Sequence, residues 1–229
     1  MGIEEFRAER TGAVVWRRRV EAAHEARILP DGCTDLIWSS RSGLVVAGPD
    51  TTAKLSRLEP GDEIVGLRFP PGTGPAVFGV PAGELRDRRP ALDDLWPAAA
   101  VAAATPTDAR TAADLLDRVA HRRLAEAGGP DPRGPVIVRH LAGGATVAGT
   151  AAAVGPSERQ LRRASTDLFG YGPKTLARIL RLRRALALLR SGLPAARVAA
   201  DAGYADQPHL ARDVRALAGV PLGGLGRSG

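Results

Sequence analysis

The feature of this 229-residue sequence that most constrains its fold is an imperfect repeat with a period of 49 residues. Sliding the chain by that period lays SERQLRRASTDLFG, residues 157–170, over DQPHLARDVRALAG, residues 206–219. The coinciding positions are two leucines, an arginine and a glycine: Leu161 with Leu210, Leu168 with Leu217, Arg163 with Arg212, and Gly170 with Gly219. Self-similarity at a fixed period indicates that one supersecondary unit occurs twice.

Each copy carries the sequence pattern of helix, tight turn and helix. In the first copy, Thr146 is placed to cap TVAGTAAAV and Gly155 to end it. Ser157 and Gln160 then form an S-x-x-Q capping box that begins the next helix. Asp206 is the equivalent cap in the second copy. This is the layout of a helix-turn-helix, with second helices predicted at about 157–169 and 206–218.

A long helix is predicted between the two copies. Pro173 suits its first turn, and Ser191 and Gly192 end it. Its apolar residues fall on one stripe: Leu176, Ile179, Leu182, Leu186 and Leu189. Eighteen helical residues make a rod of roughly 27 Å at 1.5 Å each. With the width of the flanking helices added, this approaches the length of one DNA turn, about 34 Å.

The net charge of +7 is concentrated in the same region. Residues 130–229 hold 15 Lys and Arg against 6 Asp and Glu, whereas residues 1–129 hold 17 against 19. Such a block favours nucleic acid or an anionic surface as partner. No apolar run approaches the roughly 18 to 20 residues of a membrane span, and the acidic start does not read as a secretory signal. We therefore expect a cytoplasmic protein with no membrane partner.

The first part of the chain has a different pattern of apolar and turn-forming residues. From about Val14 to Phe78, short apolar runs such as DLIW and EIVGLRF alternate with turn sequences rich in Gly, Pro and Asp, which predicts strands. The expected fold class is α+β: a small β-rich domain, residues 1–105, then an all-α domain, residues 130–229.

Residues 106–129 are predicted as an amphipathic helix and linker. The helix either packs on its own domain or serves dimerisation, and nothing local decides between them. Three tryptophans of the first domain are candidates either for a pocket lining or for the core: Trp16, Trp38 and Trp96.

Metal sites and catalysis have little support. Cys33 is the only cysteine, which excludes an internal disulfide and a cysteine-built zinc site, and the four histidines lack ligand-like spacing. An enzyme would have to use Cys33, with His24, Asp31 and Asp35 nearby in sequence. A lone cysteine in a β-rich segment behaves as a small core residue unless its thiolate is stabilised. We predict no catalytic residue, metal or cofactor.

The two copies, TVAGTAAAVGPSERQLRRASTDLFGYGPKTLARILRLRRAL and PAARVAADAGYADQPHLARDVRALAGVPL, resemble the DNA-binding domain of the AraC/XylS family of bacterial transcription regulators. The resemblance covers about 95 residues. It departs from the family pattern at Ser165 and Val214, where the family usually has an aromatic side chain. The segments ILPDGCTDLIW and GLRFPPGTGPAVFGVPAGEL are similar to an uncharacterised domain found ahead of such DNA-binding domains.

The position of residues in the motif assigns candidate DNA contacts. Side chains in the early turns of the second helix of each unit are expected at base edges: Arg159, Arg162 and Arg163, then Gln207, His209 and Arg212. Other candidates, mainly for phosphate contact or helix capping, are Ser157, Gln160, Lys174, Arg178 and Arg181. A surface arginine can also be merely solvated, and His209 can cap or pack instead.

The predicted function is a sequence-specific DNA-binding transcription regulator, not an enzyme. Its partners would be double-stranded DNA, with RNA polymerase and a small-molecule effector of the N-terminal domain as further candidates, acting as a monomer or homodimer. The alternative is an architectural protein that binds DNA without reading bases.

Overall fold

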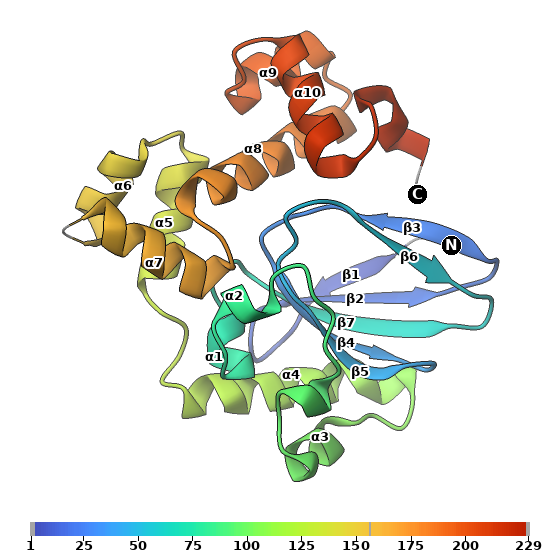
Figure 1. Ribbon diagram of the computed structural model, residues 1–229. Coiled ribbons are helices and arrows are strands. Elements are labelled where there is room, and N and C mark those ends of the chain that lie inside the picture. Colours follow the sequence, from blue (N-terminus) through green and yellow to red (C-terminus); the bar gives the residue numbers. More distant parts are fainter. Residues whose placement is uncertain (1–2, 156, 228–229) are drawn as a thin grey trace.

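The computed structural model describes residues 3–155 and 157–227, and the fold is α+β as predicted (Figure 1). Among the described residues, the strands lie in the N-terminal half: β1 (Glu4–Arg7), β2 (Val14–Arg19), β3 (His24–Ile28), β4 (Thr34–Ser39), β5 (Gly43–Ala47), β6 (Lys54–Leu58) and β7 (Glu63–Phe69). Five form an antiparallel sheet in the order β1-β2-β7-β4-β5, and β3 pairs with β6 in a separate two-stranded ribbon.

The helices follow the strands along the chain. Those of the N-terminal half are α1 (Gly74–Phe78), α2 (Ala82–Leu85), η1 (Leu92–Asp94), α3 (Ala98–Ala104) and α4 (Ala109–Glu126). Those of the C-terminal half are α5 (Arg133–Ala142), α6 (Val147–Val154), α7 (Glu158–Phe169), α8 (Pro173–Arg190), α9 (Ala195–Ala202), α10 (Gln207–Ala218) and η2 (Leu222–Arg227). None of the described helices combines the length and the apolar character needed to cross a bilayer.

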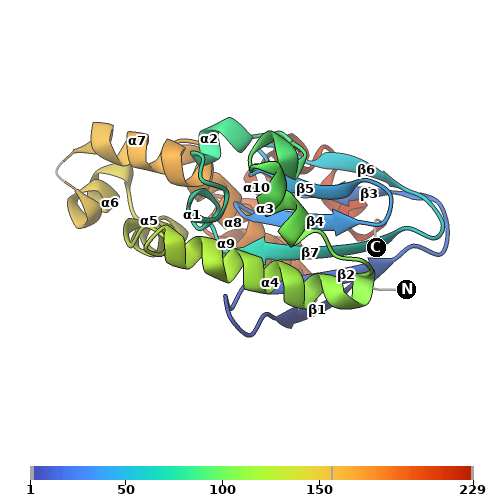
Figure 2. The ribbon, with the colours of Figure 1, turned by 90° about the horizontal axis from the view of Figure 1, so that it is seen from below.

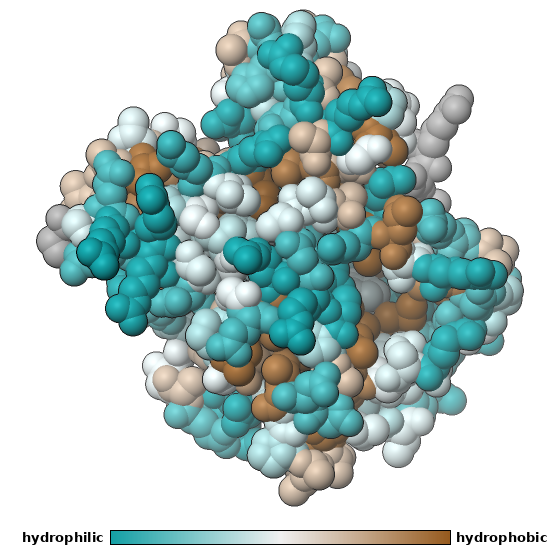
Figure 3. Space-filling model, viewed as in Figure 1, coloured by the Kyte–Doolittle hydropathy of each residue, from teal (hydrophilic) through white to brown (hydrophobic). Residues whose placement is uncertain are grey.

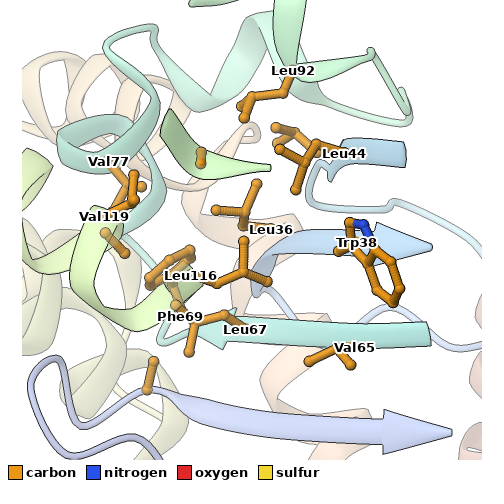
Figure 4. Close-up of a cluster of buried hydrophobic side chains, with 14 of the residues drawn as sticks. Leu36, Trp38, Leu44, Val65, Leu67, Phe69, Val77, Leu92, Leu116 and Val119 are labelled. Carbon is orange, nitrogen blue, oxygen red and sulfur yellow. The ribbon is translucent and has the colours of Figure 1, made fainter. Parts of the chain in front are cut away.

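One face of the five-stranded sheet forms the N-terminal core (Figure 4). The register places Val15 and Leu36 opposite Leu67, and Trp38 opposite Val65. Because side chains alternate across a strand, this register puts every second residue of four strands on the same face. The apolar residues of this face are almost completely buried.

Helix α4 covers that face of the sheet (Figure 2). Leu116 and Ala120 lie in the same core as the strands, and Asp108 caps the helix by accepting from the backbone N–H of Thr111 at 2.9 Å. Buried Asp117 accepts hydrogen bonds from the backbone N–H groups of Arg10 and Thr11. Of the two uses considered for this helix, the structure supports packing on its own domain.

The opposite face of the sheet carries a polar cluster. Asp35 and Arg68 are cross-strand neighbours joined by hydrogen bonds of 3.2 Å, and Trp16 Nε1 donates to Asp35 at 2.8 Å. Burial raises the pKa of Asp35 above its ordinary value, and the charge of Arg68 opposes that rise. Gly66 is required beside Trp16, because a Cβ on Gly66 would lie 2.1 Å from the Trp16 ring.

The three tryptophans do not share a pocket. Trp38 and Trp96 belong to the core face, whereas Trp16 lies on the polar face.

Three strands have no counterpart among the predicted apolar runs. Strand β1 is exposed along its whole length, and β3 and β6 pair with each other rather than with the main sheet. These segments, EEFR, HEARI and KLSRL, bury too few side chains to produce an alternating apolar pattern.

The packing of α4 predicts that Leu116→Ala destabilises the protein by about 2 to 5 kcal/mol, because it leaves a cavity beneath the sheet. The control is Leu55→Ala, the same truncation at a side chain that is 52% exposed, which should change stability by no more than about 0.5 kcal/mol. Urea denaturation of both variants measures the difference. Equal effects would show that α4 is not part of the core.

Candidate nucleic-acid interface

The first helix-turn-helix is formed by α6 and α7. Thr146 caps α6 by accepting from Gly149 N–H at 3.0 Å, and Ser157 caps α7 by accepting from Gln160 N–H at 3.2 Å. Leu161 and Leu168 point into the core, while Arg159, Arg162 and Arg163 are exposed. Helix α7 therefore presents a basic face in its first two turns, and hydrophilic side chains cover the left edge of Figure 3, where α7 lies.

The second helix-turn-helix is formed by α9 and α10. Asp206 caps α10 by accepting from His209 N–H at 2.6 Å, with Pro208 in the first turn. Gln207 and Arg212 are exposed. His209 is only half-exposed, because its ring packs edge-on against Tyr204 with centroids 5.1 Å apart.

The sequence repeat is a structural repeat. Leu161 and Leu210 are both buried, as are Leu168 and Leu217. Gly170 and Gly219 end their helices with φ of 82° and 71°, a left-handed conformation that favours glycine. The matched positions are thus the ones that shape each unit.

Each unit has its own hydrophobic core, and α8 contributes to both. Leu176, Ile179 and Leu180 belong to the core of the first unit. Leu182 and Leu186 belong to the core of the second unit. The division falls at one turn of α8, so a single helix carries the two units end to end.

The two positions that depart from the family pattern are buried. Ser165 is fully buried, and its hydroxyl donates to the carbonyl of Tyr171 at 2.8 Å. Val214 is fully buried in the second core. Ser165 therefore stabilises the turn after α7 by hydrogen bonding, where an aromatic residue would have acted by volume.

The candidate DNA contacts fall into two groups. Arg159, Arg162, Lys174, Gln207 and Arg212 are exposed, and no side-chain ion pair or hydrogen bond engages them among the described residues. Arg163 is 88% exposed and lies 3.9 Å from Asp167, a loose pair of the kind that contributes little to stability. These side chains are free to meet a ligand.

Arg178 and Arg181 instead have intramolecular partners. Arg178 forms an ion pair with Asp213 of α10, and the Arg181 guanidinium lies 5.3 Å from the Tyr204 ring centroid. Tyr204 also donates its hydroxyl to Asp213 at 3.3 Å. Burial raises the pKa of Tyr204 above its ordinary value, which favours the protonated hydroxyl that donates this bond.

Asp213 is the important residue of this domain that sequence analysis missed. Its carboxylate is buried and receives both Arg178 from α8 and Tyr204 from the turn before α10. Composition does not predict this burial, because an acidic residue in a basic helix is expected to lie on the exposed surface. Its spacing could have found it, because Asp213 lies between the core positions Leu210, Val214 and Leu217 on the inner face of α10.

The cysteine on which an enzyme would depend is poorly placed for nucleophilic chemistry. Cys33 is buried, and burial raises the pKa of its thiol well above the ordinary value. The His24 ring is engaged by residues close in sequence, because its Nδ1 donates to the carbonyl of Ala22 and its Nε2 accepts from Arg18. Among the residues the structure describes, no three His, Cys, Asp or Glu side chains lie close enough to hold a metal ion.

The contrast between the two Arg–Asp pairs gives a prediction. Arg178→Ala should lower the free energy of unfolding by about 2 to 4 kcal/mol, because it leaves the buried Asp213 carboxylate without its charge partner. Arg163→Ala breaks an exposed pair and should cost no more than about 0.5 kcal/mol. Chemical denaturation of the two variants compares them directly, and an Arg178 cost as small as that of Arg163 would contradict the structural role.

Two sequence families match parts of the chain. Residues 150–227 match "Helix-turn-helix domain", and residues 13–90 match "Domain of unknown function (DUF6597)". No curated protein is significantly similar to the chain in sequence. The matched helix-turn-helix begins inside α6 and includes the rest of the first unit and the whole second unit, and DUF6597 includes β2 to β7.

Among solved structures, several of ToxT from Vibrio cholerae are similar to this chain at low identity. ToxT from strain O395 matches with 8% identity, TM-score 0.47, and coverage of 91% of this chain and 94% of ToxT. ToxT bound to (E)-4-(8-methylnaphthalen-1-yl)but-3-enoic acid matches with 9% identity and a TM-score of 0.49, and the match covers 91% of this chain and 95% of ToxT. Unsaturated fatty acid bound ToxT from strain SCE256 matches with 10% identity and a TM-score of 0.47, and the match covers 90% of this chain and 91% of ToxT. These values are too low to indicate a shared ligand.

The predicted resemblance is confirmed at the level of domains. The geometry of two capped units on one long helix agrees with the matched sequence family, and the strands before them agree with the second. A basic, exposed second helix in each unit is the DNA-binding element of such a domain. The chain joins a DUF6597 domain to a C-terminal AraC-type helix-turn-helix domain, the DNA-binding domain of a transcription regulator.

Proposed function

We propose that this protein is a sequence-specific transcription regulator that inserts α7 and α10 into successive major grooves of one duplex. The observation that carries the proposal is the pair of exposed helix faces at equivalent positions of the repeat, with Arg163 matched by Arg212. Both faces lie in the early turns, the part of a recognition helix that reaches base edges.

The chemistry of these side chains suits base recognition. Arg159, Arg162, Arg163 and Arg212 can each donate two hydrogen bonds to guanine O6 and N7, and Gln207 can pair with adenine. Each good bidentate contact gives about 1 to 3 kcal/mol of discrimination against a wrong base. Since no side chain described in the structure competes closely for most of these groups, they need not break internal bonds to bind.

Phosphate contacts would fix the register without reading sequence. Lys174 lies in the first turn of α8, and Ser157 and Gln160 lie at the N-terminus of α7, where helix N–H groups and the dipole favour an anion. Arg178 keeps 43% of its side chain exposed while it pairs with Asp213. It can therefore hold α10 in place and contact a phosphate at the same time. His209 is the weakest candidate, because its ring is engaged by Tyr204.

The length of α8 fits binding in two grooves. Its 18 residues span roughly 27 Å, which approaches one helical turn of DNA once the units at its ends are added. In this proposal, residues 130–229 bind DNA in the cytoplasm. Residues 1–105 sense a ligand or partner or mediate assembly, and the segment 106–129 joins the two domains through α4.

The proposal is tested by selecting duplexes from a random pool with the full chain, then measuring affinity across salt concentrations. We expect one bipartite sequence that binds on the order of a thousandfold above random DNA. Arg163→Ala/Arg212→Ala should abolish most of that preference, because it removes the base contacts at equivalent positions of both units.

The control is Arg57→Ala/Arg88→Ala, which removes the same charge from exposed positions of the N-terminal half. This control should keep the sequence preference and change only the long-range electrostatic attraction. Steeply salt-dependent binding with no preferred sequence would replace the regulator with the architectural alternative.

A further inference from the structure

The two recognition helices end at equivalent points, and both ends touch the N-terminal half of the chain. Helix α7 ends at Phe169 and Gly170, and α10 ends at Ala218 and Gly219. The last carbonyls of a helix lack intrahelical partners and carry the negative end of its dipole. A cation or other donor placed there stabilises the helix and fixes its position.

One arginine of the N-terminal half binds each of these ends. Arg86, just after α2, donates from Nη1 to the carbonyl of Gly170 at 3.2 Å. Arg27, in β3, donates from Nη1 to the carbonyl of Ala218 at 3.0 Å. The two arginines come from different elements, and each is distant in sequence from the helix that it caps.

Gly170 and Gly219, the glycines at these ends, lie against residues of the N-terminal half. A Cβ on Gly170 would be 2.8 Å from Pro49 Cγ and 3.1 Å from the carbonyl oxygen of Ala82, and one on Gly219 would be 3.3 Å from Arg27 Nη1. Gly203, which ends α9 with a similar positive φ, has no described atom within 4 Å of such a Cβ. Contact with the N-terminal half is therefore a property of the recognition helices and not of every helix end in the domain.

Further contacts support both attachments. At the α10 end, Ala53 N–H donates to the carbonyl of Leu217 at 2.7 Å, and Leu29 packs against the core of the second unit. At the α7 end, Phe169 packs so closely on Gly72 that a Cβ there would lie 2.9 Å from its ring. Between them, Arg183 of α8 donates to the carbonyl of Asp31 at 3.0 Å.

These attachments matter because the two units have separate cores. Within the C-terminal half, α8 and the Arg178–Asp213 ion pair connect the units. Long helices bend, and a small change of bend or twist in α8 would change the angle between α7 and α10. The N-terminal half contacts both units from outside, at the C-terminal ends of α7 and α10, and so opposes that change.

We propose that Arg27 and Arg86 are positioning residues, through which the N-terminal domain fixes the separation and relative orientation of α7 and α10. The full chain then accepts two half-sites at one spacing only, and anything that shifts the β3–β6 ribbon against α2 changes which spacing is read. The proposal rests on the proposed function, because it requires that both helices bind bases. It adds the N-terminal domain to the determinants of operator choice.

The test compares duplexes that carry the selected site with its natural spacer or with 2 bp inserted. Two base pairs rotate one half-site by roughly 70°, given about 10.5 bp per turn. The wild-type chain should lose on the order of a hundredfold in affinity, since the contacts of one helix are lost. Arg27→Ala/Arg86→Ala should lose less than about fivefold, while its affinity for a single half-site stays at the wild-type value.

Matched controls lie close to both arginines. Arg57 is in β6 of the same ribbon and pairs with Glu59, and Arg88 donates to the Glu84 carbonyl of its own segment. Arg57→Ala/Arg88→Ala should keep the hundredfold spacer penalty. Arg27→Lys/Arg86→Lys should restore part of it, because lysine still donates to a carbonyl, whereas a loss caused by altered folding would show no such rescue.

The outcomes separate this proposal from the proposed function. If the wild-type chain selects no sequence, the proposed function fails and the spacer test cannot begin. If it selects a site and the Arg27→Ala/Arg86→Ala variant keeps the full spacer penalty, the positioning role is wrong. If that variant gains affinity for every duplex, the contacts are inhibitory, which also overturns the proposal.

A measurement without DNA covers the case in which the variant binds poorly. Spin labels on Ala152→Cys of α6 and Ala196→Cys of α9, both exposed positions, report the separation of the two units. The wild-type background should give one narrow distance distribution, and the Arg27→Ala/Arg86→Ala background a broader one. Identical distributions would show that α8 alone sets the arrangement.

Discussion

The structure of the C-terminal half depends on α8 and its apolar side chains. The side chains before Leu182 are buried in one unit and those from Leu182 onward in the next, so within the C-terminal half α8 is the main connection between α7 and α10. The arrangement makes the distance between units a matter of helix length, which the backbone fixes at 1.5 Å per residue. Their relative angle is fixed less firmly, since a helix resists stretching better than bending. Additional contacts are therefore expected where the angle matters.

Asp213 supplies one such contact from inside the domain. A buried carboxylate is costly unless it is paired and hydrogen-bonded, and here Arg178 and Tyr204 both reach it. Because Arg178 belongs to α8 and Tyr204 precedes α10, the pair ties the second unit to the connecting helix at a defined rotation. The carbonyls at the ends of α7 and α10 supply the other contacts, from outside the domain.

Local sequence pattern predicted the helices and caps of the C-terminal half but not its buried Asp213, and it predicted the N-terminal half only in part. Caps such as Ser157 and Asp206, and buried positions such as Leu161 and Leu210, act within one or two turns, so local pattern predicts them. The β3–β6 ribbon was missed because its strands bury little surface. The contacts of Arg27 with Ala218 and of Arg86 with Gly170 join residues far apart in the chain, and nothing local to either arginine indicates a carbonyl partner.

The number of arginines in this chain therefore does not indicate how many of them are available to bind DNA. Arg68 is occupied by carboxylates and Arg27 by a helix-end carbonyl, whereas Arg212 faces solvent. Guanidinium groups suit all of these uses, because their five donors can satisfy carbonyls and carboxylates as well as bases and phosphates. What distinguishes a DNA contact is a donor with no close acceptor within the fold, on a face that no other element covers. By this criterion Arg159, Arg162 and Arg212 are candidate DNA contacts on α7 and α10, whereas Arg27 and Arg86 are engaged by the carbonyls at the C-terminal ends of the same helices.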